Sequence, residues 1–206
     1  MSSILIKGDT YQDRSHAVLT ATRGALHVDA YQSHLQMLPV TNAKFLRIIN
    51  AGDEVAIAYN KMFKALIDYP EKMRYAVTLE DDMIPPQDAL TKLVESMEAH
   101  PEMSGISALY YTKSHPKIPL VLGHPEVAQD ASPRNPTGFV ECNIIPQGLG
   151  IFRASMFREL PYPWFQTTRE SQDVYFCRRA RDKGYRFAVD CNIRAGHLDV
   201  VTGEIF

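Results

Sequence analysis

The chain has 206 residues, of which 45% are hydrophobic and 22% are charged, and its formal net charge at pH 7 is −2. This balance is typical of a soluble globular protein with one sizeable core, and it excludes a broad basic surface for nucleic acid. The three cysteines, Cys142, Cys177 and Cys191, are odd in number and widely spaced, so we expect buried free thiols rather than disulfides or a zinc knuckle. No stretch is apolar and long enough for a signal peptide or a membrane span, which predicts a cytoplasmic domain.

The first half of the chain alternates between strand and helix patterns. Runs rich in β-branched and aromatic residues predict strands over 16–22, 43–50, 75–79 and 105–111. Apolar residues at helical spacing predict helices over 28–38, 54–68 and 89–100. In the first of these helices the apolar positions are Val28, Tyr31, Leu35 and Leu38, and Asp53 is the expected cap of the second. This order predicts an α/β fold with a mixed, mostly parallel central sheet flanked by helices, as in Rossmann-like domains.

The second half is less regular. Residues 112–140 contain five prolines, and a connection of this length in a compact domain is usually functional or mobile. Basic character in this long loop comes from Lys113, His115, Lys117, His124 and Arg134. Beyond it we expect a strand over 148–152, a short helix over 155–160, a helix over 172–183 that ends at Gly184, and a strand over 185–189.

Three consecutive carboxylates follow the predicted strand over 75–79. Strand alternation would place Glu80 and Asp82 on one face and Asp81 on the other. Two carboxylates at the carboxyl end of a buried strand form a site for a hard cation, and open α/β sheets bind ligands at this edge. The alternative is an acidic loop that only solvates the end of the strand.

Two further residues, Asp173 and His197, admit a structural and a chemical interpretation. Asp173 lies in the first turn of a helix that Ser171 could cap, where an acid stabilises the helix dipole by ~0.3–1 kcal/mol. A lone histidine such as His197 is more often a surface or core residue than a ligand. Imidazole nevertheless joins carboxylates well around Mn²⁺, and less readily around Mg²⁺. The residues alone leave both interpretations open.

Several stretches, taken in order, resemble the GT-A glycosyltransferases, and among them the family-2-like enzymes that use nucleotide sugars. These stretches are TATRG at 20–24, LEDDM at 79–83, QGLGIFR at 147–153, PWF at 163–165 and ESQDVYFC at 170–177, followed by His197. The resemblance covers roughly residues 16 to 199. It implies one GT-A-like domain over 1–206, with a nucleotide-binding half over 16–111, the long loop over 112–140, and an acceptor and catalytic half over 141–206.

The resemblance implies metal-dependent transfer of a sugar from a nucleotide-diphosphate sugar to a hydroxyl acceptor. Inversion and retention of the anomeric centre both stay open, and the assignment of Asp173 favours inversion. Asp173 would be the base that deprotonates the acceptor. The divalent cation, Mn²⁺ or Mg²⁺, would be held by Asp82 and His197, with Glu80 acting directly or through water. The nucleotide would contact Thr20, Thr22, Arg23, Tyr59, Asn60 and Asp81, and the sugar and acceptor would contact Gly148, Gly150, Trp164 and Gln172. Tyr59 stands where many relatives carry an arginine, and it would stack on the base instead.

Two other functions stay open. A nucleotidyltransferase or sugar-nucleotide pyrophosphorylase also combines a Rossmann-like half with paired acids. Such an enzyme would be expected to carry a glycine-rich basic phosphate loop. Arg23-Gly24 matches such a loop only in part, with one basic residue and one glycine. The other is a non-catalytic nucleotide-sugar-binding domain, against which Asp82 and Asp173 argue. The acceptor could be a glycan, a lipid-linked sugar, a protein side chain or a modified DNA base, and the oligomeric state also stays open.

Overall fold

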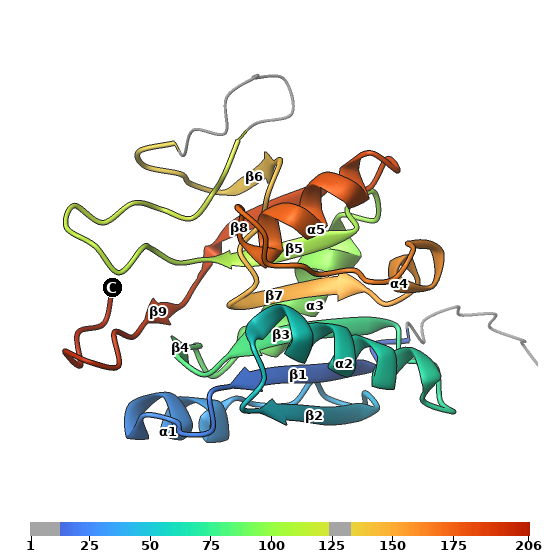
Figure 1. Ribbon diagram of the computed structural model, residues 1–206, viewed down its shortest axis with the longest axis horizontal. Helices are drawn as coiled ribbons and strands as arrows, with labels where there is room; N and C mark the ends of the chain where they lie inside the picture. The colour runs from blue at the N-terminus through green and yellow to red at the C-terminus, as the bar shows by residue number, and fades with distance from the viewer. Residues whose placement is uncertain (1–12, 124–132) are drawn as a thin grey trace, which may run out of the picture.

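The predicted α/β architecture is confirmed by the computed structural model, which describes residues 13–123 and 133–206 (Figure 1). Its central sheet has seven strands in the order β2-β1-β3-β7-β5-β8-β6. The strands are β1 (His16–Thr22), β2 (Phe45–Ala51), β3 (Tyr75–Glu80), β5 (Gly105–Leu109), β6 (Phe139–Cys142), β7 (Leu149–Arg153) and β8 (Phe187–Arg194). Strands β6 and β7 run antiparallel to their neighbours, and the other five share one direction, so the sheet is mixed and mostly parallel.

Helices cover both faces of this sheet and create two hydrophobic cores. The helices are α1 (Val28–Gln36), α2 (Val55–Asp68), α3 (Ala89–Ala99), α4 (Met156–Glu159) and α5 (Gln172–Arg181). Helices α2, α4 and α5 lie on one face, where Phe63, Phe157 and Phe176 pack with the sheet, and α3 lies on the other (Figure 1). Burial of these large side chains, each contributing roughly 1.5–3 kcal/mol, stabilises the two layers against the sheet.

Three short strands are absent from the sequence-based prediction. Strand β6 lies at the end of the predicted loop over 112–140, and β4 (Met83–Ile84) pairs antiparallel with β9 (Gly196–His197) in a separate two-stranded sheet. Segments of two to four residues are too short to show strand alternation, so they escape detection by pattern. The β4–β9 pair matters for the site because it carries His197 alongside Met83, the residue that follows Asp82.

Helix α1 packs with the opposite face from the one that its apolar spacing predicts. Val28, Tyr31, Leu35 and Leu38 are all more than half exposed, and the buried residues of α1 are Ala30 and His34. The reason is that α1 contacts β4 rather than the open sheet, and the His34 Nε2 atom bonds the Met83 carbonyl at 3.0 Å.

The start of α2 also differs from the prediction, because Glu54 caps the helix in place of Asp53. The Glu54 carboxylate accepts hydrogen bonds from the backbone N–H groups of Ala56 (3.0 Å) and Ile57 (3.3 Å). Asp53 instead pairs with Lys61 at 2.8 Å. The longer glutamate side chain reaches the free N–H groups of the first turn from the residue next to the helix.

Two predictions on the chain as a whole concern cysteines and membrane spans. Cys142, Cys177 and Cys191 are buried free thiols, as predicted. Within 13–123 and 133–206, none of the helices has the length and apolar character needed to cross a membrane. His124, part of the predicted basic loop, lies outside the described residues.

Buried histidines predict a loss of stability in mild acid. Burial lowers the pKa of His34 below 6.5, and it also lowers the pKa of His16. A histidine with a lowered folded-state pKa stabilises the fold above its unfolded value, near 6.5, and this contribution is lost as the pH falls through the folded-state pKa.

We therefore expect the free energy of unfolding to fall between pH 6.5 and 5, by at most about 1.4 kcal/mol per pH unit for each such group. Urea unfolding of the wild type and of His34→Gln over this range measures the effect. The variant should show a shallower decline, because its amide does not titrate. If the free energy of unfolding falls equally with pH in the wild type and the variant, His34 has the same pKa in the folded and unfolded states.

Candidate active site

A cavity of about 380 Å³ opens at the carboxyl ends of β1 and β3. Its lining comes from 21–23 at the end of β1, 53–55 at the start of α2, 80–82 at the end of β3, and Gln172 at the start of α5. The volume lies in the range of small-molecule sites, and this edge of an α/β sheet is the usual place for them. The structure therefore gathers several predicted site residues, Thr22, Arg23, Glu80, Asp81 and Asp82, into one cavity.

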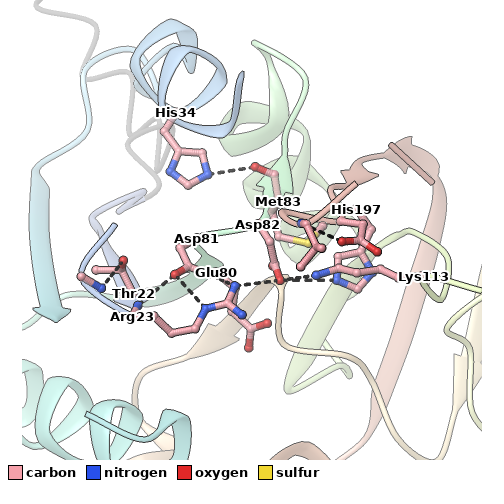
Figure 2. A network of polar contacts seen from close by, with 12 residues as sticks. Thr22, Arg23, His34, Glu80, Asp81, Asp82, Met83, Lys113 and His197 are labelled. Atoms are coloured by element: carbon pink, nitrogen blue, oxygen red, sulfur yellow. Dashed lines mark hydrogen bonds and ion pairs between the residues drawn. The ribbon is translucent and has the colours of Figure 1, made fainter. Parts of the chain in front are cut away.

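Arg23 binds the carboxylates that follow β3. Its backbone N–H donates to Asp81 Oδ2 at 2.9 Å, and its Nη2 donates to Asp81 Oδ1 at 2.9 Å (Figure 2). The same Nη2 lies 3.5 Å from Asp82 Oδ2. The strand alternation used in the prediction does not extend to the two aspartates, because β3 ends at Glu80 and both lie in the turn between β3 and β4. Asp81 thus anchors the loop after β1. For Asp81 to contact a nucleotide, its ion pair with Arg23 would have to break.

Asp82 stands at the centre of the polar network in Figure 2. Its Oδ2 atom accepts a hydrogen bond from Lys113 Nζ at 2.5 Å and lies 3.8 Å from His197 Nε2. Its Oδ1 atom is buried without a hydrogen-bond partner among the described residues. A buried, ionised oxygen without a donor is costly, by about 1–3 kcal/mol or more, so this atom is available to a ligand.

His197 presents an unprotonated nitrogen to Asp82. Its Nδ1 lies 2.8 Å from the Tyr111 carbonyl, which can only accept, so Nδ1 carries the proton and Nε2 keeps its lone pair. Burial lowers the pKa of His197, and the positive charge of Lys113 lowers it further. The neutral imidazole with its Nε2 facing a carboxylate is the form that binds a metal ion.

Glu80 exchanges its proton near neutral pH. Burial raises its pKa from 4.5 to about 7, and the charges of Asp82 and Asp173 act in the same direction. The Tyr59 hydroxyl donates to Glu80 Oε1 at 3.1 Å, which partly opposes this rise. A buried carboxyl group with a strongly raised pKa beside a cavity is a candidate functional group.

The predicted metal ligands are brought together only in part. In the parts of the chain that the structure describes, no group of three or more His, Cys, Asp or Glu side chains could hold a metal ion. Glu80 is engaged by Tyr59, which leaves Asp82 and His197 as a pair. A carboxylate and a neutral imidazole suit Mn²⁺ better than Mg²⁺, and water and substrate phosphates would have to supply the remaining ligands.

Three predicted binding residues on and near α2 are structural. Tyr59 is fully buried and contacts Phe63 and Phe165, so its ring is not available to stack on a base. The Asn60 side chain donates to the Phe165 carbonyl at 2.7 Å and accepts from the Trp164 N–H at 2.9 Å. The Trp164 indole is also buried. Tyr59 therefore acts on the site through Glu80, and Asn60 holds the segment that contains Trp164.

The predicted glycine and threonine residues support the cavity from within the sheet. Gly148 donates its N–H to the Tyr110 hydroxyl at 2.7 Å, and a Cβ atom here would lie 2.6 Å from that oxygen and 2.7 Å from Met83 Sδ. Gly150 pairs with Thr78 in the middle of the sheet, and Thr20 is buried in β1. Gly148 is therefore required by close packing beneath the site.

Asp173 and Gln172 begin α5 beside the cavity. Gln172 is part of the lining. Asp173 Oδ1 accepts hydrogen bonds from the Ser171 hydroxyl and from the Val174 N–H. Its charge contributes to the raised pKa of Glu80, so Asp173 lies within electrostatic reach of the carboxylates at the end of β3.

Four lining or contact residues were not predicted as site residues. Asp53, Glu54 and Val55 line the cavity because β2 ends at the same edge as β1 and β3. The Gly52-Asp53 turn after the second predicted strand was the signal that could have placed them there. Lys113 was noted only as part of a basic loop, and its contact with Asp82 joins positions 31 residues apart.

Gln147, next to Gly148, carries a buried amide whose oxygen and nitrogen both lack partners among the described residues. Its backbone carbonyl accepts from the Tyr59 hydroxyl at 3.2 Å, which a change of side chain preserves. We expect Gln147→Met to raise the free energy of unfolding by about 1 kcal/mol, because it removes two unsatisfied polar groups at similar size. Urea unfolding measures this, with the exposed Gln36→Met as the control. A less stable Gln147→Met would show that the amide is satisfied in solution.

Comparison with known proteins identifies the fold. No protein-family model matches the chain, and no curated protein matches it. Among solved structures, A197 from STIV matches with a TM-score of 0.69 and 12% identity over 93% of each chain. UDP-glucose pyrophosphorylase complexed with UDP-glucose matches with a TM-score of 0.56 and 10% identity, over 92% of this chain and 95% of that one. The chain thus shares the Rossmann-like α/β fold of a nucleotide-sugar enzyme, and identities this low show the fold alone.

Proposed function

We propose that this protein is a nucleotide-sugar enzyme that transfers the sugar to a hydroxyl acceptor. One observation carries the proposal: Arg23 and Asp82 line a single cavity at the carboxyl ends of β1 and β3, and His197 Nε2 lies 3.8 Å from the Asp82 carboxylate. The shared fold with UDP-glucose pyrophosphorylase supports a nucleotide sugar as the ligand class. The ordered resemblance to GT-A glycosyltransferases supports transfer as the reaction.

A diphosphate group would need cationic partners here, because the carboxylates that line the cavity outnumber its one basic side chain, Arg23. Arg23 and Lys113 supply two cationic side chains beside Asp82. Guanidinium and ammonium groups both bind phosphate, the former through paired N–H donors. Asp82 and His197 would hold a divalent cation, Mn²⁺ or Mg²⁺, which would neutralise the charge that develops on the leaving diphosphate.

Asp173 is the proposed base. The acceptor oxygen forms a bond to the anomeric carbon as the bond from that carbon to the diphosphate oxygen breaks, and the electron pair leaves with the nucleoside diphosphate. The acceptor proton passes to the Asp173 carboxylate, because a hydroxyl is a poor nucleophile until a base takes its proton. Displacement in one step of this kind inverts the anomeric centre. The acceptor, whether glycan, lipid-linked sugar, protein or modified DNA base, belongs to the edge near Gln172.

Sugar-nucleotide pyrophosphorylase activity is the second candidate, and the structural match to UDP-glucose pyrophosphorylase favours it. The two reactions differ in what they require of Asp173. In the pyrophosphorylase reaction a phosphate oxygen attacks phosphorus, and this nucleophile is already ionised. It needs cationic groups such as Arg23 and Lys113, but no base that removes a hydroxyl proton.

Thermal unfolding in the presence of nucleotide-diphosphate sugars, with and without Mn²⁺, tests the ligand class. A ligand at a hundred times its dissociation constant adds about 2.7 kcal/mol of stability. For a chain of this size we expect an increase in Tm of roughly 5–10 °C. The increase should depend on Mn²⁺ and on the nucleotide base. If millimolar nucleotide sugars with Mn²⁺ leave the Tm unchanged, the proposal is wrong.

A further inference from the structure

Lys113 occupies the position beside Asp82 that a bound cation would take. Its Nζ atom lies 2.5 Å from Asp82 Oδ2, and both side chains are largely shielded from solvent, with exposed fractions of 24% and 11%. The contact is made from the segment after β5, where the Thr112 N–H donates to the Ile118 carbonyl at 2.9 Å. This turn brings the base of the long loop to the end of β3 (Figure 2).

Asp81 and Asp82 are both paired with cationic side chains in the arrangement that the structure shows. The carboxylates of Asp81 and Asp82 face the guanidinium of Arg23 and the ammonium of Lys113. A divalent cation alone would enter beside two positive groups, and a diphosphate alone would enter beside two negative ones. Each of these is unfavourable at a partly buried site, where charges interact more strongly than in water. A cation and a diphosphate that enter together carry opposite charges, so each lowers the cost of admitting the other.

We propose that Lys113 is a diphosphate-binding residue that pairs with Asp82 until the diphosphate arrives, and so couples cation binding to nucleotide binding. The inference rests on the proposed nucleotide-sugar function. Lysine suits such an exchange because its charge is compact and its four-carbon stem is flexible. When Lys113 turns to a phosphate oxygen, both oxygens of Asp82 become available beside His197 Nε2. Arg23 makes three hydrogen bonds to Asp81, one from its backbone N–H and two from its side chain. Its guanidinium therefore turns to a phosphate oxygen less readily than the Lys113 ammonium does.

The matched control is Lys117, on the same loop. Its Nζ contacts the Ile205 carbonyl at 3.4 Å and lies 4.8 Å from the centre of the Phe206 ring. Lys117→Met therefore removes a positive charge from the same segment and leaves the contact with Asp82 in place. Both substitutions change partly or largely exposed side chains, and circular dichroism verifies that each variant is folded.

The experiment is a titration of Mn²⁺, monitored by electron paramagnetic resonance, with and without inorganic pyrophosphate. We expect wild type and Lys117→Met to bind Mn²⁺ weakly alone and more tightly with pyrophosphate, by a factor in the range of roughly 5- to 150-fold that is typical of coupled sites. Lys113→Met should bind Mn²⁺ alone more tightly than wild type by a factor in the same range, and the effect of pyrophosphate should shrink. Adding Asp82→Asn to Lys113→Met should abolish this gain.

Two results would overturn the proposal. One is a Lys113→Met variant that binds Mn²⁺ alone no more tightly than wild type. The other is a wild type whose Mn²⁺ affinity does not change with pyrophosphate. Failure of the proposed function is a separate result: a gain in Mn²⁺ affinity in Lys113→Met, together with no response to any nucleotide sugar, supports the role of Lys113 and rejects the donor class.

Discussion

Replacement of Asp82 by asparagine is expected to remove the Mn²⁺-dependent thermal shift and to lower turnover by roughly 10²–10³-fold, the range found when one electrostatic stabiliser of a transition state is lost. The substitution keeps the size of the side chain but removes the charge that faces Lys113, Arg23 and His197. An amide oxygen is a much weaker ligand for a divalent cation than a carboxylate. Thermal unfolding with nucleotide sugar and Mn²⁺, followed by a turnover assay, measures both effects.

Asp88→Asn is the matched control for this prediction. Asp88 pairs with Lys92 at 2.8 Å on the surface, one helical turn apart, and exposed pairs of this kind contribute little to stability. The control variant should keep the thermal shift and the turnover of wild type. An Asp82→Asn variant with an undiminished Mn²⁺-dependent shift would place the cation elsewhere in the molecule.

Replacement of Asp173 by asparagine is expected to lower the rate of sugar transfer while leaving the binding of the nucleotide sugar unchanged. The amide cannot accept the acceptor proton, so the rate of transfer should fall by about 10²–10⁴-fold. The thermal shift with nucleotide sugar and Mn²⁺ should stay close to that of wild type, because Asp82 and Arg23 are unchanged. Loss of the acid from the first turn of α5 should cost only ~0.3–1 kcal/mol of stability. Kinetics and thermal unfolding of the same preparation make the comparison.

Asp182→Asn provides the control on the same helix, because Asp182 lies at the other end of α5. It should leave the rate of transfer unchanged. Full transfer activity in Asp173→Asn would contradict its role as base. Pyrophosphorolysis that persists in Asp173→Asn would instead favour the pyrophosphorylase candidate, whose nucleophile needs no base.

The sequence predicts the elements that carry strong patterns. The strand that ends in Glu80 appears as predicted, because five consecutive apolar or β-branched residues leave little alternative in a buried sheet. The amphipathic helix α2 likewise appears with nearly the predicted bounds. The same reasoning fails for α1, whose apolar stripe at Val28 and Leu35 faces solvent. A periodic pattern shows that a helix has an apolar face and a polar face. The neighbouring elements determine which of the two is buried.

Contacts between distant segments account for most of what the sequence could not predict at the site. The Arg23–Asp81 and Lys113–Asp82 pairs depend on where the loops after β1 and β5 turn, and no local pattern encodes this. The family resemblance predicted that Tyr59 contacts the nucleotide base, because it stands where many relatives carry an arginine. The structure instead buries its ring and uses its hydroxyl to hold Glu80. The cluster of acids at the carboxyl end of β3 could therefore be predicted, but the partner of each side chain could not.

The central claim is tested most directly by the products formed from a nucleotide-diphosphate sugar. The protein is incubated with Mn²⁺ and with uridine, guanosine, adenosine or thymidine diphosphate sugars, and the nucleotides are separated by chromatography. The proposed function predicts release of the nucleoside diphosphate from one of these donors, with water as the acceptor in the absence of a better one, and loss of this release in Asp173→Asn. Formation of nucleoside triphosphate only when pyrophosphate is added, or no release from any donor, would contradict it.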